Sequence, residues 1–342
     1  MDSLNKMEFY KKHQLSSKLL IVDGMWGVGK SIIARLMSVF DDAECWRIDL
    51  PFDHIPQLYA KGSIKENAAT ALIVSLFDEI TYNISISRSV NFRFKDESSI
   101  FGHPKKYDYM LRLLEGGGGD SLKDKVIIPI ATHLSSSNND FFLRAFGKRC
   151  QIIGCVRHPL FNVDYCSGYI SRCQTDPRDL NLKFNYNEEN LPFFAESWED
   201  EYLEANNLEK SIKSISLLTK SYDENFDKMK KKYGDSSVLQ IPYEDMVMKT
   251  DHVISLLSKF VGKDVNSKLY KRIKKRERIP RDSMAEGSGY NSLEWRRNIK
   301  NKKSDKIVME ERLKYIKNKV RANYYDEMLL LVEAYEKKWS VK

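Results

Sequence analysis

Residues 19–37, with the sequence LLIVDGMWGVGKSIIARLM, constrain the fold more than any other part of the chain. They fit the pattern G-x-x-x-x-G-K-[ST] at Gly24, Gly29, Lys30 and Ser31. An apolar run precedes the pattern and apolar residues at helical spacing follow it, which is the order of strand, turn and helix that a phosphate-binding loop requires. The stretch therefore predicts an α/β fold in which this loop binds a phosphate group.

The residue types in the loop suit an anion. Glycine accommodates positive φ, so successive backbone N–H groups can point at one phosphate, and the following helix adds the positive end of its dipole. Lys30 supplies a mobile positive charge, and Ser31 a hydroxyl for a phosphate oxygen or a metal ion. We expect nucleotide contacts from Gly24, Trp26, Gly27, Val28, Gly29, Lys30 and Ser31.

The composition is that of an ordinary globular protein. The chain has 342 residues, of which 42% are hydrophobic and 30% charged, enough for one large α/β domain. No apolar run approaches about 18 residues and the N-terminus lacks an apolar signal core, so we expect a cytoplasmic protein without a membrane span. Five cysteines without a C-x-x-C pair predict neither a disulfide framework nor a zinc site.

A net charge of +8 favours anionic ligands. Much of the excess lies in residues 268–281 and 296–303. Such runs are usually solvated faces; nucleic-acid binding is a second explanation, and arginines that reach back to a nucleotide are a third. Nucleic acid is not the partner we expect, because residues 268–303 interleave few aromatic residues with the basic ones: Tyr270, Tyr290 and Trp295.

The periodicity of the sequence favours one domain over residues 1–342. Short apolar runs predict strands at 19–22, 45–50, 126–134, 150–159 and 237–242. Helical spacing predicts helices at 30–40, 67–80, 106–114, 140–146, 206–232 and 251–261. This alternation predicts a three-layer α/β fold of the P-loop type with a central parallel sheet, a helical insertion at about 181–235 and a helical, basic C-terminal tail.

Ligands of a parallel sheet bind at the carboxyl ends of its strands, where this chain offers a histidine and an arginine. His133 follows the run at 126–132 and is placed to act as a general base, although a loop histidine bonded to backbone explains it equally well. Arg157 follows the next run and offers a planar fork for a phosphate monoester, with a surface ion pair as the alternative. Neither strand ends in the carboxylate that a P-loop kinase uses to hold Mg²⁺.

Three segments resemble, in this order, the motifs of sulfotransferases that use 3'-phosphoadenosine 5'-phosphosulfate (PAPS). They are THL at 132–134, IIGCVRHPLFNVDYCSGY at 152–169 and VLQIPYEDMVMKTDHVISLLSKFVG at 238–262. The resemblance implies that His133 is the catalytic base and that Arg157 binds the 3'-phosphate. It also implies that a C-terminal segment at about 268–303 closes over the nucleotide.

The chain departs from that family's pattern at several positions. It has a complete Walker A sequence, with Lys30 where threonine is usual, and Ala131 replaces a lysine, so we expect Lys30 to stabilise the leaving group. The serine expected eight residues after Arg157 is Tyr165, and Ser167 follows two residues later. For the family's basic triplet, the nearest substitutes are Arg276 and Arg278.

The resemblance implies sulfuryl transfer from PAPS to a hydroxyl or amine of a small-molecule or carbohydrate acceptor, without a metal, leaving adenosine 3',5'-bisphosphate. An ATP-dependent small-molecule kinase is the alternative, with Asp49, or next Glu244 and Asp245, holding Mg²⁺ beside Ser31. A non-catalytic nucleotide-binding module is a third possibility. We expect residues 52–114 and 181–232 to form the acceptor pocket. The candidates for its lining are Arg93, Tyr107, Tyr109, Phe193, Phe194 and Trp198.

Overall fold

A five-stranded parallel sheet forms the centre of the computed structural model. Its strands are β1 (Lys18–Gly24), β2 (Arg47–Ile48), β3 (Ile127–Ala131), β4 (Cys150–Val156) and β7 (Val238–Pro242), in the order β2-β3-β1-β4-β7. All residues are described except 1–9, 13–14, 16, 116–125, 138, 174–175, 177–178, 180, 285–303 and 340–342. The predicted α/β fold with a central parallel sheet is confirmed.

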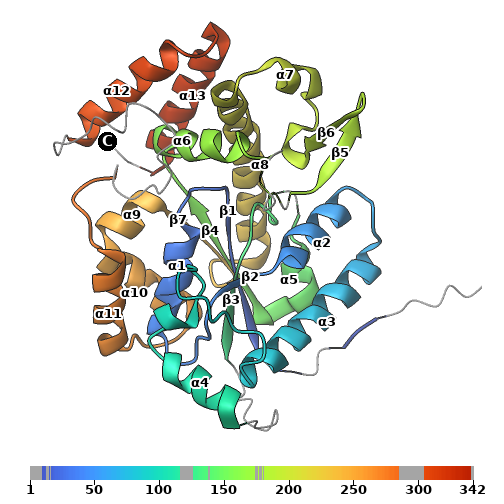
Figure 1. The fold of residues 1–342 in the computed structure, drawn as a ribbon, viewed down its shortest axis with the longest axis vertical. Coiled ribbons are helices and arrows are strands. Elements are labelled where there is room, and N and C mark those ends of the chain that lie inside the picture. Colours follow the sequence, from blue (N-terminus) through green and yellow to red (C-terminus); the bar gives the residue numbers. More distant parts are fainter. Residues whose placement is uncertain are drawn as a thin grey trace, which may run out of the picture.

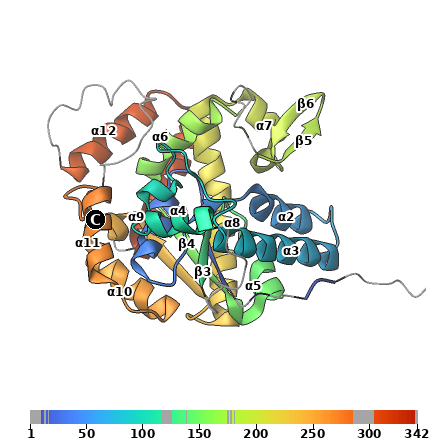
Figure 2. The same ribbon diagram turned by 60° about the horizontal axis from the view of Figure 1, so that its bottom comes forward.

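Helices cover both faces of this sheet and make a three-layer molecule. Figures 1 and 2 show one group on one side, namely α1 (Lys30–Leu36), α10 (Thr250–Val261) and α11 (Ser267–Glu277). The opposite side carries α3 (Glu66–Ser85), α5 (Phe141–Phe146) and α8 (Asn207–Tyr233). Because both faces are covered, the strands are continuous apolar runs, and β3 is buried along its whole length.

Seven further α-helices occur in the described part of the chain. They are α2 (Leu50–Ala60), α4 (Lys106–Glu115), α6 (Pro159–Ile170), α7 (Glu199–Glu204), α9 (Tyr243–Met248), α12 (Asp305–Lys317) and α13 (Ala322–Trp339). Helix α6 packs on α8, and α13 packs on both. No helix in the described part of the chain is long and apolar enough to cross a membrane.

The register of the sheet brings the predicted strand ends together. In β1, Val22 lies opposite Ala131 of β3 and Ile153 of β4. The residues that follow β3 and β4 therefore lie on either side of the turn that follows β1. This alignment puts His133 on one side of the glycine-rich loop and Arg157 on the other.

Two predicted elements differ from the structure. The strand expected at 45–50 is only β2, because the Leu-Pro sequence at 50–51 starts α2. The insertion expected to be helical from residue 181 begins instead with an antiparallel hairpin of β5 (Lys183–Tyr186) and β6 (Glu189–Pro192). Its two turn residues, Asn187 and Glu188, both have positive φ, as the twist of a tight hairpin demands.

Another prediction falls partly outside the described residues. The nucleotide-closing segment predicted at about 268–303 does so from residue 285 onward. The five cysteines, in contrast, are all described, and all five are free and buried.

Candidate functional site

The loop between β1 and α1 needs its glycines for both conformation and space. Gly27 and Gly29 have φ of 79° and 89°. A Cβ atom on Gly27 would lie 2.6 Å from the ring of Tyr165, and one on Gly29 would lie 2.5 Å from the ring of Tyr243. The loop is thus held closely between α6 and the start of α9.

The ammonium of Lys30 lies inside this turn. Its Nζ donates to the carbonyl oxygens of Gly24, at 2.8 Å, and Met25, at 2.6 Å. Burial lowers its pKa to about 8, although the carboxylate of Asp23 opposes the shift. The neighbouring loop side chains lie elsewhere: Trp26 stacks on Tyr169 with 4.5 Å between ring centroids, Val28 is buried, and Ser31 is half-buried at the start of α1.

Asp23, the last residue but one of β1, fixes the segment that carries His133. Its buried carboxylate accepts hydrogen bonds from Oγ1 of Thr132 at 2.9 Å and from the backbone N–H groups of Ser135 and Ser136 at 3.2 and 2.8 Å. Three donors satisfy most of this carboxylate. These hydrogen bonds of Asp23 connect the end of β1 to the loop after β3.

The ring of His133 is held by a carboxylate that the sequence analysis did not single out. Asp53, in the first turn of α2, accepts from the backbone N–H of His133 at 2.5 Å and lies 3.0 Å from its Nδ1. One turn further along α2, Gln57 donates to the carbonyl oxygen of His133 at 3.4 Å. Asp53 was missed because it lies 80 residues away in the sequence, and only the fold brings the two together.

His133 borders a cavity of about 270 Å³ beside the loop. An aromatic wall of four residues, Trp26, Tyr165, Tyr169 and Phe193, forms part of its lining. Polar side chains form much of the rest, namely Asp53, His54, Gln57, His133, Arg172, Asp176 and Asn181. The cavity is therefore an aromatic surface ringed by hydrogen-bonding groups, with an imidazole among them.

Both ranges expected to form the acceptor pocket contribute to this cavity, through Asp53, His54 and Gln57 of 52–114 and Asn181, Leu182 and Phe193 of 181–232. Of the six candidates named individually, only Phe193 lines it. Trp198 packs in the core with its Nε1 donating to the carbonyl of Phe194, and Tyr109 is buried with its hydroxyl on Glu44. Tyr107 and Arg93 are exposed on the surface. Their positions are explained by packing and solvation.

Arg157 lies on the other side of the loop. One of its guanidinium nitrogens donates to the carbonyl of Gly27 at 2.9 Å, and the group stacks 4.0 Å above the ring centroid of Tyr243. Arg281, the last residue of the basic run at 268–281, donates to the hydroxyl of Tyr243 at 2.6 Å. Two arginines therefore meet at the tyrosine that covers the loop at Gly29.

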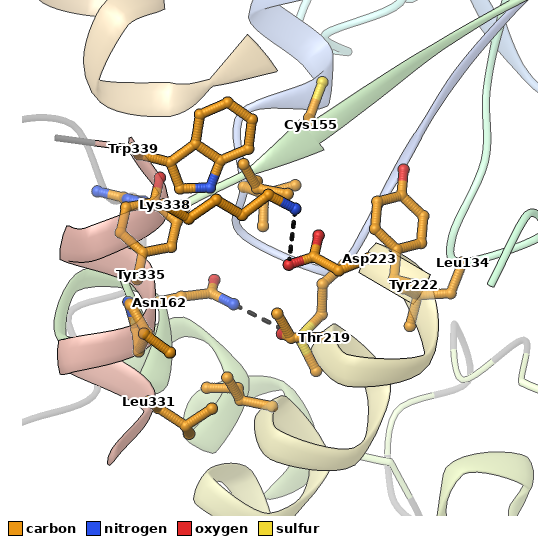
Figure 3. A pocket seen from close by; sticks show the side chains of 17 residues that line it. Leu134, Cys155, Asn162, Thr219, Tyr222, Asp223, Leu331, Tyr335, Lys338 and Trp339 are labelled. Carbon is orange, nitrogen blue, oxygen red and sulfur yellow. Dashed lines mark hydrogen bonds and ion pairs between the residues drawn. The ribbon is translucent and has the colours of Figure 1, made fainter. Parts of the chain in front are cut away.

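A second cavity, of about 190 Å³, lies next to Arg157 between α6, α8 and α13. Figure 3 shows Tyr335, Lys338 and Trp339 of α13 facing Thr219, Tyr222 and Asp223 of α8 across it. The ammonium of Lys338 pairs with Asp223 at 3.0 Å (Figure 3). Since Met25 lines this cavity and Trp26 the first, the glycine-rich loop runs between the two.

The other residues predicted to contact the nucleotide do not all lie near the loop. Tyr165 packs on Gly27 and lines the first cavity, while Ser167 is buried in α6. Arg276 donates to the carbonyl of Gly102 and pairs with Glu277, and Arg278 is exposed where α11 ends. The structure thus brings Tyr165 to the loop and directs Arg276 to the segment before α4.

The carboxylates of the kinase alternative are engaged elsewhere. Asp49 pairs with Arg47 at 2.8 Å, and Asp245 pairs with Lys249 at 2.8 Å. Glu244 is buried and accepts from the backbone of His158 and the hydroxyl of Tyr335. Within the described ranges, no group of three or more His, Cys, Asp or Glu side chains is arranged to hold a metal ion.

No family model matches the sequence, and no curated protein matches it. Solved structures similar to it include the sulfotransferase domain of the Synechococcus PCC 7002 olefin synthase, at 12% identity and a TM-score of 0.39 over 96% of this chain and 98% of that one. The sulfotransferase domain from the curacin biosynthetic pathway gives 12% and 0.41 over 96% and 99%. A sulfotransferase from Mycobacterium avium gives 10% and 0.38 over 78% and 69%.

Proposed function

We propose that the protein is a sulfotransferase that moves a sulfuryl group from PAPS to a hydroxyl or amine acceptor. The observation that carries the proposal is the position of His133. Its ring is held by Asp53 beside a cavity, and Trp26 of the anion-binding loop lines the same cavity. A proton acceptor and a loop suited to a phosphosulfate are thereby brought next to each other.

The donor's anionic groups match the cationic groups around the loop. Backbone N–H groups of residues 24–31 and the ammonium of Lys30 suit the 5'-phosphosulfate, toward which Lys30 turns from the carbonyls of Gly24 and Met25. Arg157 suits the 3'-phosphate that distinguishes PAPS from ATP. Arg157 already contacts the loop at Gly27, so the groups suited to the two phosphates lie next to each other.

The reaction is an in-line displacement at sulfur. His133 removes the acceptor proton at Nε2 while the acceptor oxygen or nitrogen bonds to sulfur. The bond from sulfur to the bridging oxygen of the phosphosulfate breaks, and its electron pair stays on the departing adenosine 3',5'-bisphosphate. Lys30 and the loop N–H groups stabilise the charge that develops there, and no step requires a metal.

The cavity beside His133 supports a polar acceptor. Its aromatic wall provides a flat apolar surface, and the amide, carboxylate and guanidinium groups around it provide hydrogen-bond donors and acceptors in several directions. A small hydroxylated molecule or a sugar ring meets both requirements. The kinase alternative keeps the Walker pattern as its support, but each acid proposed to hold its Mg²⁺ is engaged in another contact.

The first test is calorimetric binding of adenosine 3',5'-bisphosphate, ADP and ATP, each with Mg²⁺ and with EDTA. We expect tight binding of the bisphosphate that is independent of metal, and weaker binding of ADP. A preference for ATP that requires Mg²⁺ would overturn the proposal in favour of the kinase. Incubation with PAPS and a panel of hydroxyl and amine acceptors, followed by mass spectrometry, then identifies the acceptor.

A further inference from the structure

We propose that Asp53 is a positioning residue that makes His133 a base, because it holds the imidazole in the tautomer whose Nε2 accepts a proton. This inference rests on the proposed function and adds a residue to its machinery. Asp53 touches neither donor nor acceptor in the scheme above; it acts only through His133.

The two contacts between Asp53 and His133 fix both the backbone and the ring of the histidine. One carboxylate oxygen accepts from the backbone N–H at 2.5 Å, and the other lies 3.0 Å from Nδ1 of the ring. The side chain of Asp53 is 7% exposed, so water competes little for either oxygen. The ring of His133 is 29% exposed and stays open to the cavity.

The neighbouring contacts leave His133 little other freedom. Asp23 holds Thr132 on one side and Ser135 and Ser136 on the other, and Gln57 bonds the carbonyl of His133 itself. The backbone is therefore fixed from both sides. What remains undetermined is the rotation of the ring and the nitrogen that carries its proton, and these are what the second oxygen of Asp53 decides.

The chemistry of the pair fixes the tautomer. A neutral imidazole has one N–H and one lone pair, and an ionised carboxylate only accepts hydrogen bonds. Nδ1 facing Asp53 must therefore carry the proton, which leaves the lone pair on Nε2. When Nε2 takes the acceptor's proton, the imidazolium that forms lies beside a negative charge that stabilises it.

The substitution Asp53→Asn tests this role with little change in shape. Its amide oxygen can still accept from the backbone N–H of His133, but its NH₂ group then faces Nδ1 and imposes the Nε2–H tautomer. We expect kcat to fall about 100-fold or more, as for His133→Ala, because Nε2 then carries a proton and has no lone pair to accept one. Affinity for adenosine 3',5'-bisphosphate should stay unchanged, and the double variant should be no slower than His133→Ala alone.

The matched control is Asp140→Asn, which makes the same chemical change at a carboxylate that is likewise bonded to its neighbours. Asp140 pairs with Arg144 and Lys232, and neither partner belongs to the loop or to the cavity beside His133. We expect this variant to keep the kcat of the wild type. A kcat for Asp53→Asn equal to that of the control would overturn the proposal.

Nitrogen-15 NMR of the histidine rings tests the same inference without any activity. The signals of His133 among the six histidines are identified by their loss in His133→Ala. We expect a protonated Nδ1 in the wild type and a protonated Nε2 in Asp53→Asn. A wild-type ring protonated at Nε2 overturns the inference even if the variant does not fold. Conversely, a wild type that has a protonated Nδ1 but neither binds the bisphosphate nor catalyses sulfation would refute the proposed function. The tautomer assignment would then stay intact.

Discussion

At the scale of single residues, the loop holds a positive charge by means of its own carbonyl groups. The ammonium of Lys30 is buried and donates to Gly24 and Met25. Burial favours the neutral amine, which is why its pKa is lowered to about 8. An anion in the turn would favour the charged form, so anion binding and protonation of Lys30 are linked.

This linkage predicts a pH dependence of donor binding. Lys30 is charged below its pKa of about 8 and loses its proton as the pH rises through that value. The phosphates of adenosine 3',5'-bisphosphate are already ionised above about pH 7. The affinity for the bisphosphate should therefore change little from pH 7 to 7.5 and fall about tenfold by pH 9. Calorimetry at each pH tests this, with Lys30→Met expected to bind weakly at every pH; constant wild-type affinity would contradict the role of Lys30.

Arg157 predicts a difference between two nucleotides. Its guanidinium lies against Gly27 and Tyr243, beside the loop and not inside it. If it binds the 3'-phosphate, Arg157→Ala should weaken adenosine 3',5'-bisphosphate by about 10- to 100-fold, the value of a charge-assisted hydrogen bond. ADP lacks that phosphate and should weaken much less in the same calorimetric titrations. Equal weakening of both would show that Arg157 acts on the loop alone.

Local sequence predicted part of the candidate site and missed the rest for a physical reason. The positions of His133 and Arg157 follow from the rule that parallel strands present their carboxyl ends at one edge. The contacts of Asp53 and Arg281 depend on how α2 and the segment after α11 pack, which no local pattern encodes. Arg276 was chosen for its charge and position in the tail, but its hydrogen bond is with Gly102.

At the scale of elements, prediction followed the strength of the hydrophobic pattern. The strands β1, β3 and β4 are buried on both faces, so their apolar runs are continuous and were recognised. The hairpin of β5 and β6 is small and largely exposed, and its alternation is carried by few residues. Such a short signal, next to long charged helices, gave no strand prediction.

Helix α12 is attached to α6 by a buried ion pair. The guanidinium of Arg312 lies 2.9 Å from the carboxylate of Asp164, and both side chains are 4% exposed. Arg312→Met should lower the free energy of unfolding by about 3–5 kcal/mol, because it leaves a buried carboxylate without this partner. Urea denaturation measures the loss. Adding Asp164→Asn should restore part of the stability, and a double variant less stable than Arg312→Met would contradict this account.

At the scale of the whole molecule, distant parts of the sequence share one hydrophobic core. This core extends from Leu19 in β1 to Tyr335 in α13. The hydroxyl of Tyr335 donates to Glu244 at 2.6 Å, which connects the last helix to α9, the helix that directly follows β7. Glu244 also accepts from the backbone of His158, directly after Arg157. The C-terminal helices therefore support the side of the loop on which Arg157 lies.

We accordingly propose that residues 1–342 behave as one cooperative unit. Urea unfolding followed by tryptophan fluorescence and by far-ultraviolet circular dichroism should give coincident transitions, since separate domains would unfold separately. Adenosine 3',5'-bisphosphate should raise both midpoints together, because at a hundred times its Kd it adds about 2.7 kcal/mol to the free energy of unfolding. Deletion of residues 305–342 should abolish the cooperative transition, because it removes the cover of α6 and α8. Two separated transitions, or a truncated protein that still unfolds sharply, would instead indicate an independently folded sheet domain with the C-terminal helices as an addition.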